Sequence, residues 1–160
     1  MADAKLFRRA WSRFATGVSV VTTIEKDGNV HGMAANGIAS VSLDPMLVLI
    51  CVGHNRNSYA LIKNSGRFCI NILTEDQQNV GEYYAKPPEK RTTDTPATVV
   101  YTNSGSASFE RSLASMDCQV VSEYVAGDHT VFIAEVDEIT VGEGRPLIFF
   151  EGKWDSLASS

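Results

Sequence analysis

The stretch HGMAANGIASVSLDP, from His31 to Pro45, consists mostly of small side chains, although it lies between two segments with the composition of β-strands. Glycine, alanine and serine bury little apolar surface for each residue that they order, so a strand built from them packs weakly. We therefore expect something to lie against this bare backbone. The alternative is an edge strand that its glycines weaken.

The segments on either side of this stretch predict strands. Upstream, residues 18–24 are rich in β-branched side chains, and Asp27 and Gly28 predict a hairpin turn from which a second strand returns at Val30. Downstream, residues 46–53 (MLVLICVG) are continuously apolar, which is typical of a strand that is buried on both faces.

The N-terminal segment predicts an amphipathic helix. In residues 4–17 apolar side chains recur at helical spacing opposite basic ones, and Gly17 stands where the helix would end. Such a helix can contact a membrane or a partner protein. At this short length we expect it to pack on the core of its own chain.

Two further segments predict short helices. Residues 57–66 have helical composition, with Asn57 or Ser58 as the N-cap. Thr74 has capping-box spacing to Gln77, so another helix begins at Thr74.

Strands dominate the rest of the chain. Residues 67–73 predict one strand, residues 114–142 predict two strands joined by a tight turn, and residues 146–154 predict a last strand. Residues 86–107 are rich in Pro, Thr, Ser and Gly and predict a long surface excursion in which only residues 97–102 (ATVVYT) are strand-like. These elements predict one domain over residues 1–160 with a mainly β fold, an antiparallel barrel with a few helices.

Composition excludes several classes of partner. The 160 residues carry a net charge of -5 and have a pI near 5.1, so we expect neither nucleic acid nor an anionic membrane as a partner. The opening segment is charged, and no apolar run is long enough to span a bilayer. Cys51, Cys69 and Cys118 are far apart and lie in apolar runs, which indicates free thiols and a cytoplasmic location.

Sequence motifs leave few forms of catalysis open. The chain has no nucleophile elbow, and its three histidines, His31, His54 and His129, pair with neither cysteines nor carboxylates at metal-ligand spacing. We therefore expect neither a hydrolytic triad nor a metal site. The chain has no Walker loop and no G-x-G-x-x-G motif, so a nucleotide would have to bind in another way.

One such way is the predicted helix start near Ser58. Free main-chain N–H groups and the positive end of the helix dipole, helped by Asn57, can hold a phosphate there. The small-residue stretch can then accept a flat aromatic ring against its backbone. Each hypothesis has a simpler alternative, which is an ordinary capped helix or a weakened edge strand. His129, beside a predicted turn, is by itself best explained as an exposed or a satisfied histidine.

Five segments together resemble the flavin reductase-like family, whose fold is the FMN-binding split barrel. They are FRRAWSRFATGVSVVTT (7–23), DGNVHGMAANGIASVSLDPMLVLICV (27–52), NSYALIKNSGRFCINIL (57–73), AGDHTVFIAEV (126–136) and RPLIFFEGKW (145–154). The resemblance covers most of the chain. It implies an antiparallel split barrel of Greek-key type and a short-chain NAD(P)H:flavin oxidoreductase, the reductase component of a two-component flavin monooxygenase.

The resemblance also implies a site for FMN or FAD and for NADH or NADPH as the electron donor. The flavin would lie along the small-residue stretch, with its phosphate at the start of the short helix and its site near the interface of a homodimer. The cofactor-binding residues would be Met33, Ala34, Ala35, Asn36, Ser40, Val41, Ser42, Cys51, Val52, Asn57, Ser58, Tyr84 and Trp154. His129 would lie at the reactive face as the catalytic residue, and a flavin-dependent monooxygenase would be the partner.

Two other functions stay open at this point. One is an FMN-binding electron-transfer or carrier protein without NAD(P)H oxidase activity. The other is a split-barrel protein that binds haem or a deazaflavin.

Overall fold

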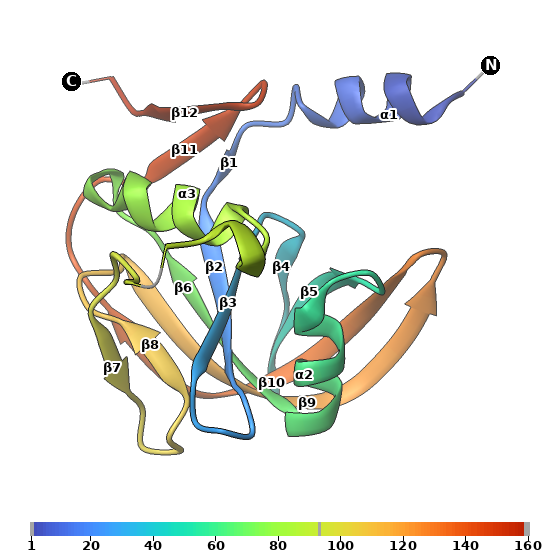
Figure 1. Ribbon diagram of the computed structural model, residues 1–160. Helices are drawn as coiled ribbons and strands as arrows, with labels where there is room; N and C mark the ends of the chain where they lie inside the picture. Colours follow the sequence, from blue (N-terminus) through green and yellow to red (C-terminus); the bar gives the residue numbers. More distant parts are fainter. Residues whose placement is uncertain (1, 93, 159–160) are drawn as a thin grey trace.

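The computed structural model describes residues 2–92 and 94–158 (Figure 1). Most of the fold is one antiparallel sheet of seven strands in the order β3-β2-β6-β9-β10-β5-β4. Its strands are β2 (Ser19–Ile24), β3 (Val30–Ala35), β4 (Ile38–Leu43), β5 (Met46–Gly53), β6 (Arg67–Ile72), β9 (Ala114–Ala126) and β10 (His129–Val141).

Smaller elements surround this sheet. In the described part of the chain they form a three-stranded sheet, a two-stranded sheet, three α-helices and two short 3-10 helices. Their bounds are β1 (Thr16–Gly17), β11 (Leu147–Phe150) and β12 (Lys153–Ser156); β7 (Val99–Tyr101) and β8 (Ala107–Phe109); α1 (Ala4–Trp11), α2 (Asn57–Ser65) and α3 (Gln78–Ala85); η1 (Glu75–Gln77) and η2 (Pro88–Lys90).

The seven-stranded sheet contributes most of the main core. Val21, Phe68, Cys118 and Phe132 reach this core from β2, β6, β9 and β10, and Ile62 closes it from α2. The two edge strands, β3 and β4, follow each other in the sequence, and no ladder joins them within residues 2–92 and 94–158. The predicted mainly β, antiparallel fold is confirmed, and its sheet is open between β3 and β4.

A second core lies between the sheet and α3, where the backbone of β3 meets Tyr84. A Cβ atom on Gly32 would lie 2.6 Å from Cε1 of the Tyr84 ring, which is closer than real Cβ contacts. The ring also stacks on Phe109, with centroids 5.3 Å apart, and its hydroxyl shares a 3.0 Å hydrogen bond with that of Thr95. Within the small-residue stretch, Gly32 therefore allows α3 to pack closely against β3.

The predicted turns and the capping box are confirmed. Gly28 and Gly127 have φ angles of 86° and 64°, in the left-handed region that glycine favours, at the turns of the β2–β3 and β9–β10 hairpins. The N–H group of Thr74 donates to Oε1 of Gln77 at 3.1 Å where the chain enters η1 and α3. These features depend on neighbouring residues, so short sequence patterns suffice to predict them.

The N-terminal helix differs from the prediction. α1 ends at Trp11 rather than at Gly17, and all eight of its residues are exposed. Figure 1 shows it extending away from the sheets. The prediction that it packs on its own core is wrong, because amphipathic spacing shows that a face needs cover but not which surface covers it. Within the described residues, no helix is long and apolar enough to cross a bilayer.

Four further predictions need correction. β5 is not buried on both faces: half-buried and buried residues alternate along it because one face points to the core. Arg56 is the N-cap of α2, without a side-chain capping bond, in place of Asn57 or Ser58. Residues 146–154 contain β11 and the first two residues of β12, rather than a single strand. The surface excursion at 86–107 contains the short helix η2, which was not predicted, whereas its strand-like part at residues 97–102 is confirmed as β7, which pairs with β8.

We expect Gly32→Ala to destabilise the protein, because the added Cβ overlaps the ring of Tyr84, which its other contacts hold in place. Overpacking of this kind costs about 1–3 kcal/mol, which urea unfolding followed by circular dichroism measures. Gly17→Ala is the matched control, since the nearest atom to its added Cβ is the carbonyl oxygen of Leu147 at 4.0 Å. Equal free energies of unfolding for the two variants would contradict this packing role.

Candidate functional site

Two adjoining cavities lie along β3 and share Ala34 and Ala85. We call them the apolar cavity, which β3, α3 and the β11–β12 hairpin line, and the polar cavity, which β3, the start of α2 and the segment from Tyr84 to Arg91 line. Each has a volume of about 250 Å³. Small-molecule sites range from about 300 to 1,000 Å³, so the pair is large enough to hold one ligand.

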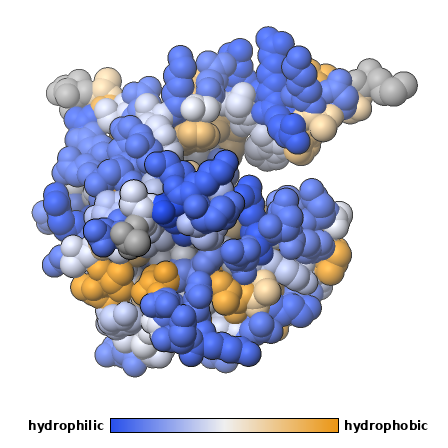
Figure 2. Space-filling view, in the orientation of Figure 1, coloured by the Kyte–Doolittle hydropathy of each residue, from blue (hydrophilic) through white to orange (hydrophobic). Residues whose placement is uncertain are grey.

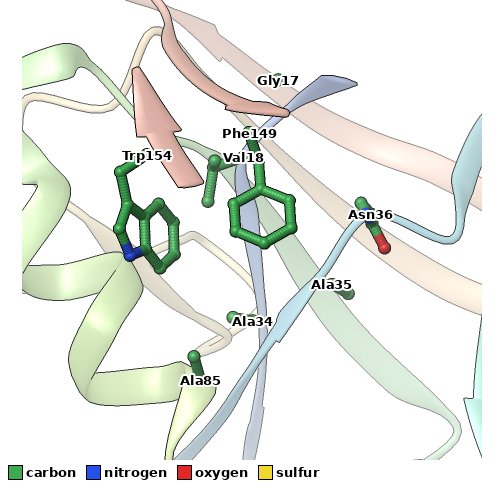
Figure 3. Close-up of a pocket in the computed structure, with 8 residues that line it drawn as sticks. All are labelled: Gly17, Val18, Ala34, Ala35, Asn36, Ala85, Phe149 and Trp154. Carbon is green, nitrogen blue, oxygen red and sulfur yellow. The ribbon is translucent and has the colours of Figure 1, made fainter. Parts of the chain in front are cut away.

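Two aromatic residues form one wall of the apolar cavity (Figure 3). Phe149 and Trp154 pair across β11 and β12, and their rings meet edge to face with centroids 5.2 Å apart. Gly81 of α3 makes room for the indole, since a Cβ there would lie 3.0 Å from Cζ3 of Trp154. Ala34 and Ala35 of β3 lie below the rings in Figure 3. The cavity is therefore a slot between aromatic rings and a nearly bare strand.

The start of α2 gives the polar cavity groups that bind anions. The first main-chain N–H groups of a helix, here from Asn57 onward, have no carbonyl partner within the helix. Arg56 at the N-cap makes no side-chain capping bond to them. Together with the positive end of the helix dipole, these groups favour a negatively charged ligand.

Arg91 adds a fixed positive charge to the polar cavity. Its Nε donates to the carbonyl of Lys86 at 2.9 Å, and its Nη2 donates to the carbonyl of Tyr84 at 3.3 Å. The guanidinium lies over the rings of Tyr83 and Tyr84, 5.6 and 5.1 Å from their centroids. Burial lowers the pKa of Arg91, but a guanidinium stays charged at neutral pH. The side chains of Lys86 and Glu89 line the same cavity with opposite charges.

A series of hydrogen-bonding side chains runs from the end of β2 to α2. His31, which is 6% exposed, meets Oγ of Ser58 through Nε2 at 2.8 Å and Oε1 of Glu25 through Nδ1 at 3.3 Å. Burial lowers the pKa of His31, the carboxylate of Glu25 opposes this shift, and the charge of Arg91 adds to it. The three residue types are those of a hydrolytic triad, which the spacing in the sequence did not indicate.

His129 lies outside both cavities, at the start of β10. Its imidazole is 47% exposed, and Nδ1 lies 2.7 Å from Oδ1 of Asp128. The hydrogen bond to His129 and its charge lower the pKa of that carboxyl. His129 pairs with Gly53, where a Cβ would lie 3.4 Å from Nε2 of His129 and 3.1 Å from Oδ1 of Asn55. The exposed imidazole therefore lies beside the residues that lead into α2.

The structure brings most of the predicted cofactor-binding residues to the two cavities. Those that line them are Met33, Ala34, Ala35, Asn36, Asn57, Ser58, Tyr84 and Trp154. Ser40, Val41 and Ser42 lie on the edge strand β4, outside the cavities, where a register shift marks a bulge. Cys51 is half-buried, and a Cβ on Gly37 would lie 3.3 Å from its Cβ. The side chain of Val52 is fully buried in the core, so only its main chain is available to a ligand.

Sequence reasoning missed Arg91, Lys86 and Phe149. Arg91 and Lys86 belong to the segment that we predicted to be a surface excursion. The available signal was a cluster of basic residues there, in a chain with a net negative charge. Phe149 lies in the apolar run that we predicted to be a single strand, and only the β11–β12 hairpin places it beside Trp154.

The chemistry of the two cavities fits a phosphorylated flavin. The apolar slot matches a flat ring, and the small residues of β3 permit its close approach to the main chain. The N–H groups at the start of α2 and the guanidinium of Arg91 match a phosphate. Among the described residues, no group of three or more His, Cys, Asp and Glu side chains is arranged to hold a metal ion.

Comparison with known proteins adds independent evidence. Residues 11–158 match the model of the flavin reductase like domain. An NADH-dependent flavin reductase from a Rhodococcus species is 37% identical over 153 residues, which cover 94% of this chain and 84% of the relative. The reductase subunit HsaB of a flavin-dependent monooxygenase from Rhodococcus jostii is 37% identical over 159 residues, which cover 97% of this chain and 78% of that relative. The solved structure of flavin reductase PheA2 in its native state aligns with a TM-score of 0.90 and 42% identity, covering 99% of this chain and 100% of that one.

Proposed function

Because this chain belongs to the flavin reductase like domain family, we propose that it is an NAD(P)H-dependent flavin reductase. It transfers hydride from NADH or NADPH to FMN or FAD and supplies the reduced flavin to a flavin-dependent monooxygenase. The predicted family and enzyme class are confirmed by relatives at 37% identity over most of the chain. The observation that carries the proposal is an apolar slot on β3 that adjoins an anion-binding cavity at the start of α2.

We place the two ends of the flavin in the two cavities. The bound flavin supplies the ring that accepts hydride, while the chain binds and orients the flavin and excludes water from its ring. Main-chain N–H groups at Asn57 and Ser58 and the guanidinium of Arg91 bind the phosphate. Trp154 covers the ring on one side. Asn36 leads from the apolar cavity into β4, where the main chain of residues 40–42 offers hydrogen-bonding groups to the polar rim of the ring.

We also propose a homodimer that α1 helps to form. Leu6, Phe7, Trp11 and Phe14 are between 54% and 64% exposed, and the three aromatic rings contact one another in series. Figure 2 shows this part of the molecule overhanging a hollow in the surface. Residues 5–13 carry four basic side chains and no acidic one, in a chain of net charge -5. A second copy therefore offers both an apolar helix and complementary acidic surface.

The position of α1 links this dimer to the site. The chain passes from α1 into β1, which pairs with β11, the strand that carries Phe149. The carbonyl of Ser12 accepts a 3.0 Å hydrogen bond from the N–H of Glu151, at the turn between β11 and β12. A second subunit seated on α1 would therefore border the apolar cavity.

We propose that the protein is a single domain and that it works in the cytoplasm. Cys51, Cys69 and Cys118 are free thiols. Burial raises the pKa of Cys69 to about 12, so this thiol stays protonated and unreactive. Free buried thiols are typical of a reducing compartment.

Anaerobic stopped-flow spectroscopy tests the proposed function. The purified protein is saturated with FMN or FAD and mixed with NADH or NADPH, and the loss of flavin absorbance is followed. We expect rapid bleaching for at least one of the four pairings. Flavin binding without bleaching in any pairing would favour the electron-transfer or carrier protein instead. Lack of flavin binding would contradict both functions and favour a haem or deazaflavin protein.

We propose that the exposed imidazole of His129 orients the nicotinamide, so we expect His129→Ala to slow hydride transfer at saturating flavin by roughly tenfold or more. The affinity for flavin should change by less than about twofold, since the side chain is exposed and lies outside both cavities. Val125→Ala, an exposed residue of the same hairpin, is the matched control. Unchanged hydride transfer at saturating flavin and nucleotide would rule out this role for His129.

We expect the double variant Phe7→Ser with Trp11→Ser to be a monomer in analytical ultracentrifugation at concentrations where the native protein is a dimer. Its subunits should keep the native circular dichroism spectrum, because both side chains are more than half exposed. Tyr101→Ser is the control, since Tyr101 is 63% exposed on β7, far from α1 in Figure 1. A native protein that is monomeric at micromolar concentration would contradict the proposed dimer.

A further inference from the structure

The hydrogen bond between His31 and Ser58 determines whether the Ser58 hydroxyl can donate a hydrogen bond to an anion in the polar cavity. The carboxylate of Glu25 can only accept a hydrogen bond, so Nδ1 of His31 carries the proton that faces it. In the neutral imidazole Nε2 is then an acceptor, and it takes the hydrogen of the Ser58 hydroxyl. The hydroxyl is left with only lone pairs for the cavity, and these repel an anion.

Protonation of His31 reverses the direction of this hydrogen bond. Nε2 then donates to Oγ of Ser58, and the hydroxyl hydrogen is free to turn into the cavity and donate to a phosphate oxygen. The imidazolium also places a positive charge next to the first turn of α2. A single proton therefore supplies both a hydrogen-bond donor and an attractive charge.

We propose that His31 is a positioning residue that takes up a proton from the solvent when Ser58 binds the phosphate of a flavin. This inference rests on the proposed flavin site and adds a link between proton uptake and phosphate binding. The proton returns to the solvent when the flavin leaves, so no other reactant is needed. Flavins that lack the phosphate bind without this proton.

The groups around His31 set the pH range of this effect. Glu25 faces it from the end of β2, Arg91 faces it from the segment after η2, and Tyr84 of α3 packs against the adjacent Gly32. Burial raises the pKa of Tyr84, so its phenol stays neutral. Burial lowers the pKa of His31, which leaves the free protein with a neutral imidazole at pH 7. A phosphate dianion beside Ser58 raises this pKa. The affinity is therefore highest below the pKa of the free protein, falls as the pH rises from there through the pKa of the bound state, and is constant above it.

Flavin titrations from about pH 6.5 to about pH 8.5 test the proposal, with FMN as the phosphorylated probe and riboflavin as its match without phosphate. We expect the native affinity for FMN to fall across this range, by up to about tenfold for each unit by which the phosphate raises the pKa of His31. The affinity for riboflavin should stay constant. Calorimetry in buffers of different ionisation enthalpy should record proton uptake with FMN and none with riboflavin.

Two variants separate this role from structural support. His31→Gln keeps a side chain that can bond Ser58 but does not titrate, so the remaining pH dependence belongs to the phosphate of FMN, whose second pKa is about 6. Glu25→Gln supplies an amide that can donate to Nδ1, which lets the neutral imidazole donate from Nε2. We therefore expect Glu25→Gln to bind FMN more tightly than the native protein at the alkaline end. Its side chain is 38% exposed, so this variant should fold even if His31→Gln does not.

The possible outcomes are distinct. A ratio of FMN to riboflavin affinity that is the same at both ends of the pH range overturns the proposal. Equal weakening of FMN and riboflavin binding in Glu25→Gln also overturns it, because this is the effect of a structural contact alone. If neither flavin binds, or if no nicotinamide bleaches a bound flavin, the proposed function itself fails. Loss of flavin binding removes the basis of this proposal as well, whereas bound flavin that no nicotinamide bleaches leaves its pH test intact.

Discussion

The contact between the ring of Tyr84 and the bare backbone at Gly32 is the constraint on which the site depends. It lets α3 approach β3, and the carbonyl of Tyr84 then accepts a hydrogen bond from Arg91, whose guanidinium lies over the same ring. A second glycine acts in the same way, since Gly81 gives Trp154 its place in the apolar cavity. Two missing Cβ atoms therefore position the charged and the aromatic groups of the two cavities. The small-residue stretch serves internal packing first, and its remaining bare positions are open to a ligand.

An acidic protein can bind an anion in this cavity because the charges that matter are local. Exposed charges are largely screened beyond about 8 Å at physiological ionic strength, so the net charge of -5 acts weakly there. The helix dipole of α2 contributes only about 0.3–1 kcal/mol. Charge-assisted hydrogen bonds contribute roughly 1.5–3 kcal/mol each, so Arg91 outweighs the dipole. The proton on His31 adds to this local charge only while an anion is present.

Short sequence patterns predicted the local structure. The other features depend on contacts between segments that are far apart in the sequence. The turns at Gly28 and Gly127 need a particular backbone angle, which neighbouring residue types specify. The exposure of α1 depends on surfaces far away in the sequence, and helical spacing carries no information about them. Within the site, residues 33–36 were identified through the family resemblance. Arg91 was missed because its place depends on the fold of α3 rather than on any motif around it.

Three of the predicted site residues outside the cavities, Ser40, Val41 and Ser42, lie on an edge strand. Within the described residues β4 pairs with β5 alone, so one row of its main-chain groups has no strand partner. Such an edge is a template for aggregation unless something blocks or covers it. The bulge between Ser40 and Ser42 interrupts the regular spacing that another strand would need, yet it leaves individual N–H and C=O groups available. These unpaired groups suit the polar rim of a flat ring better than a strand of another chain, which explains why the small-residue stretch continues past β3 into β4.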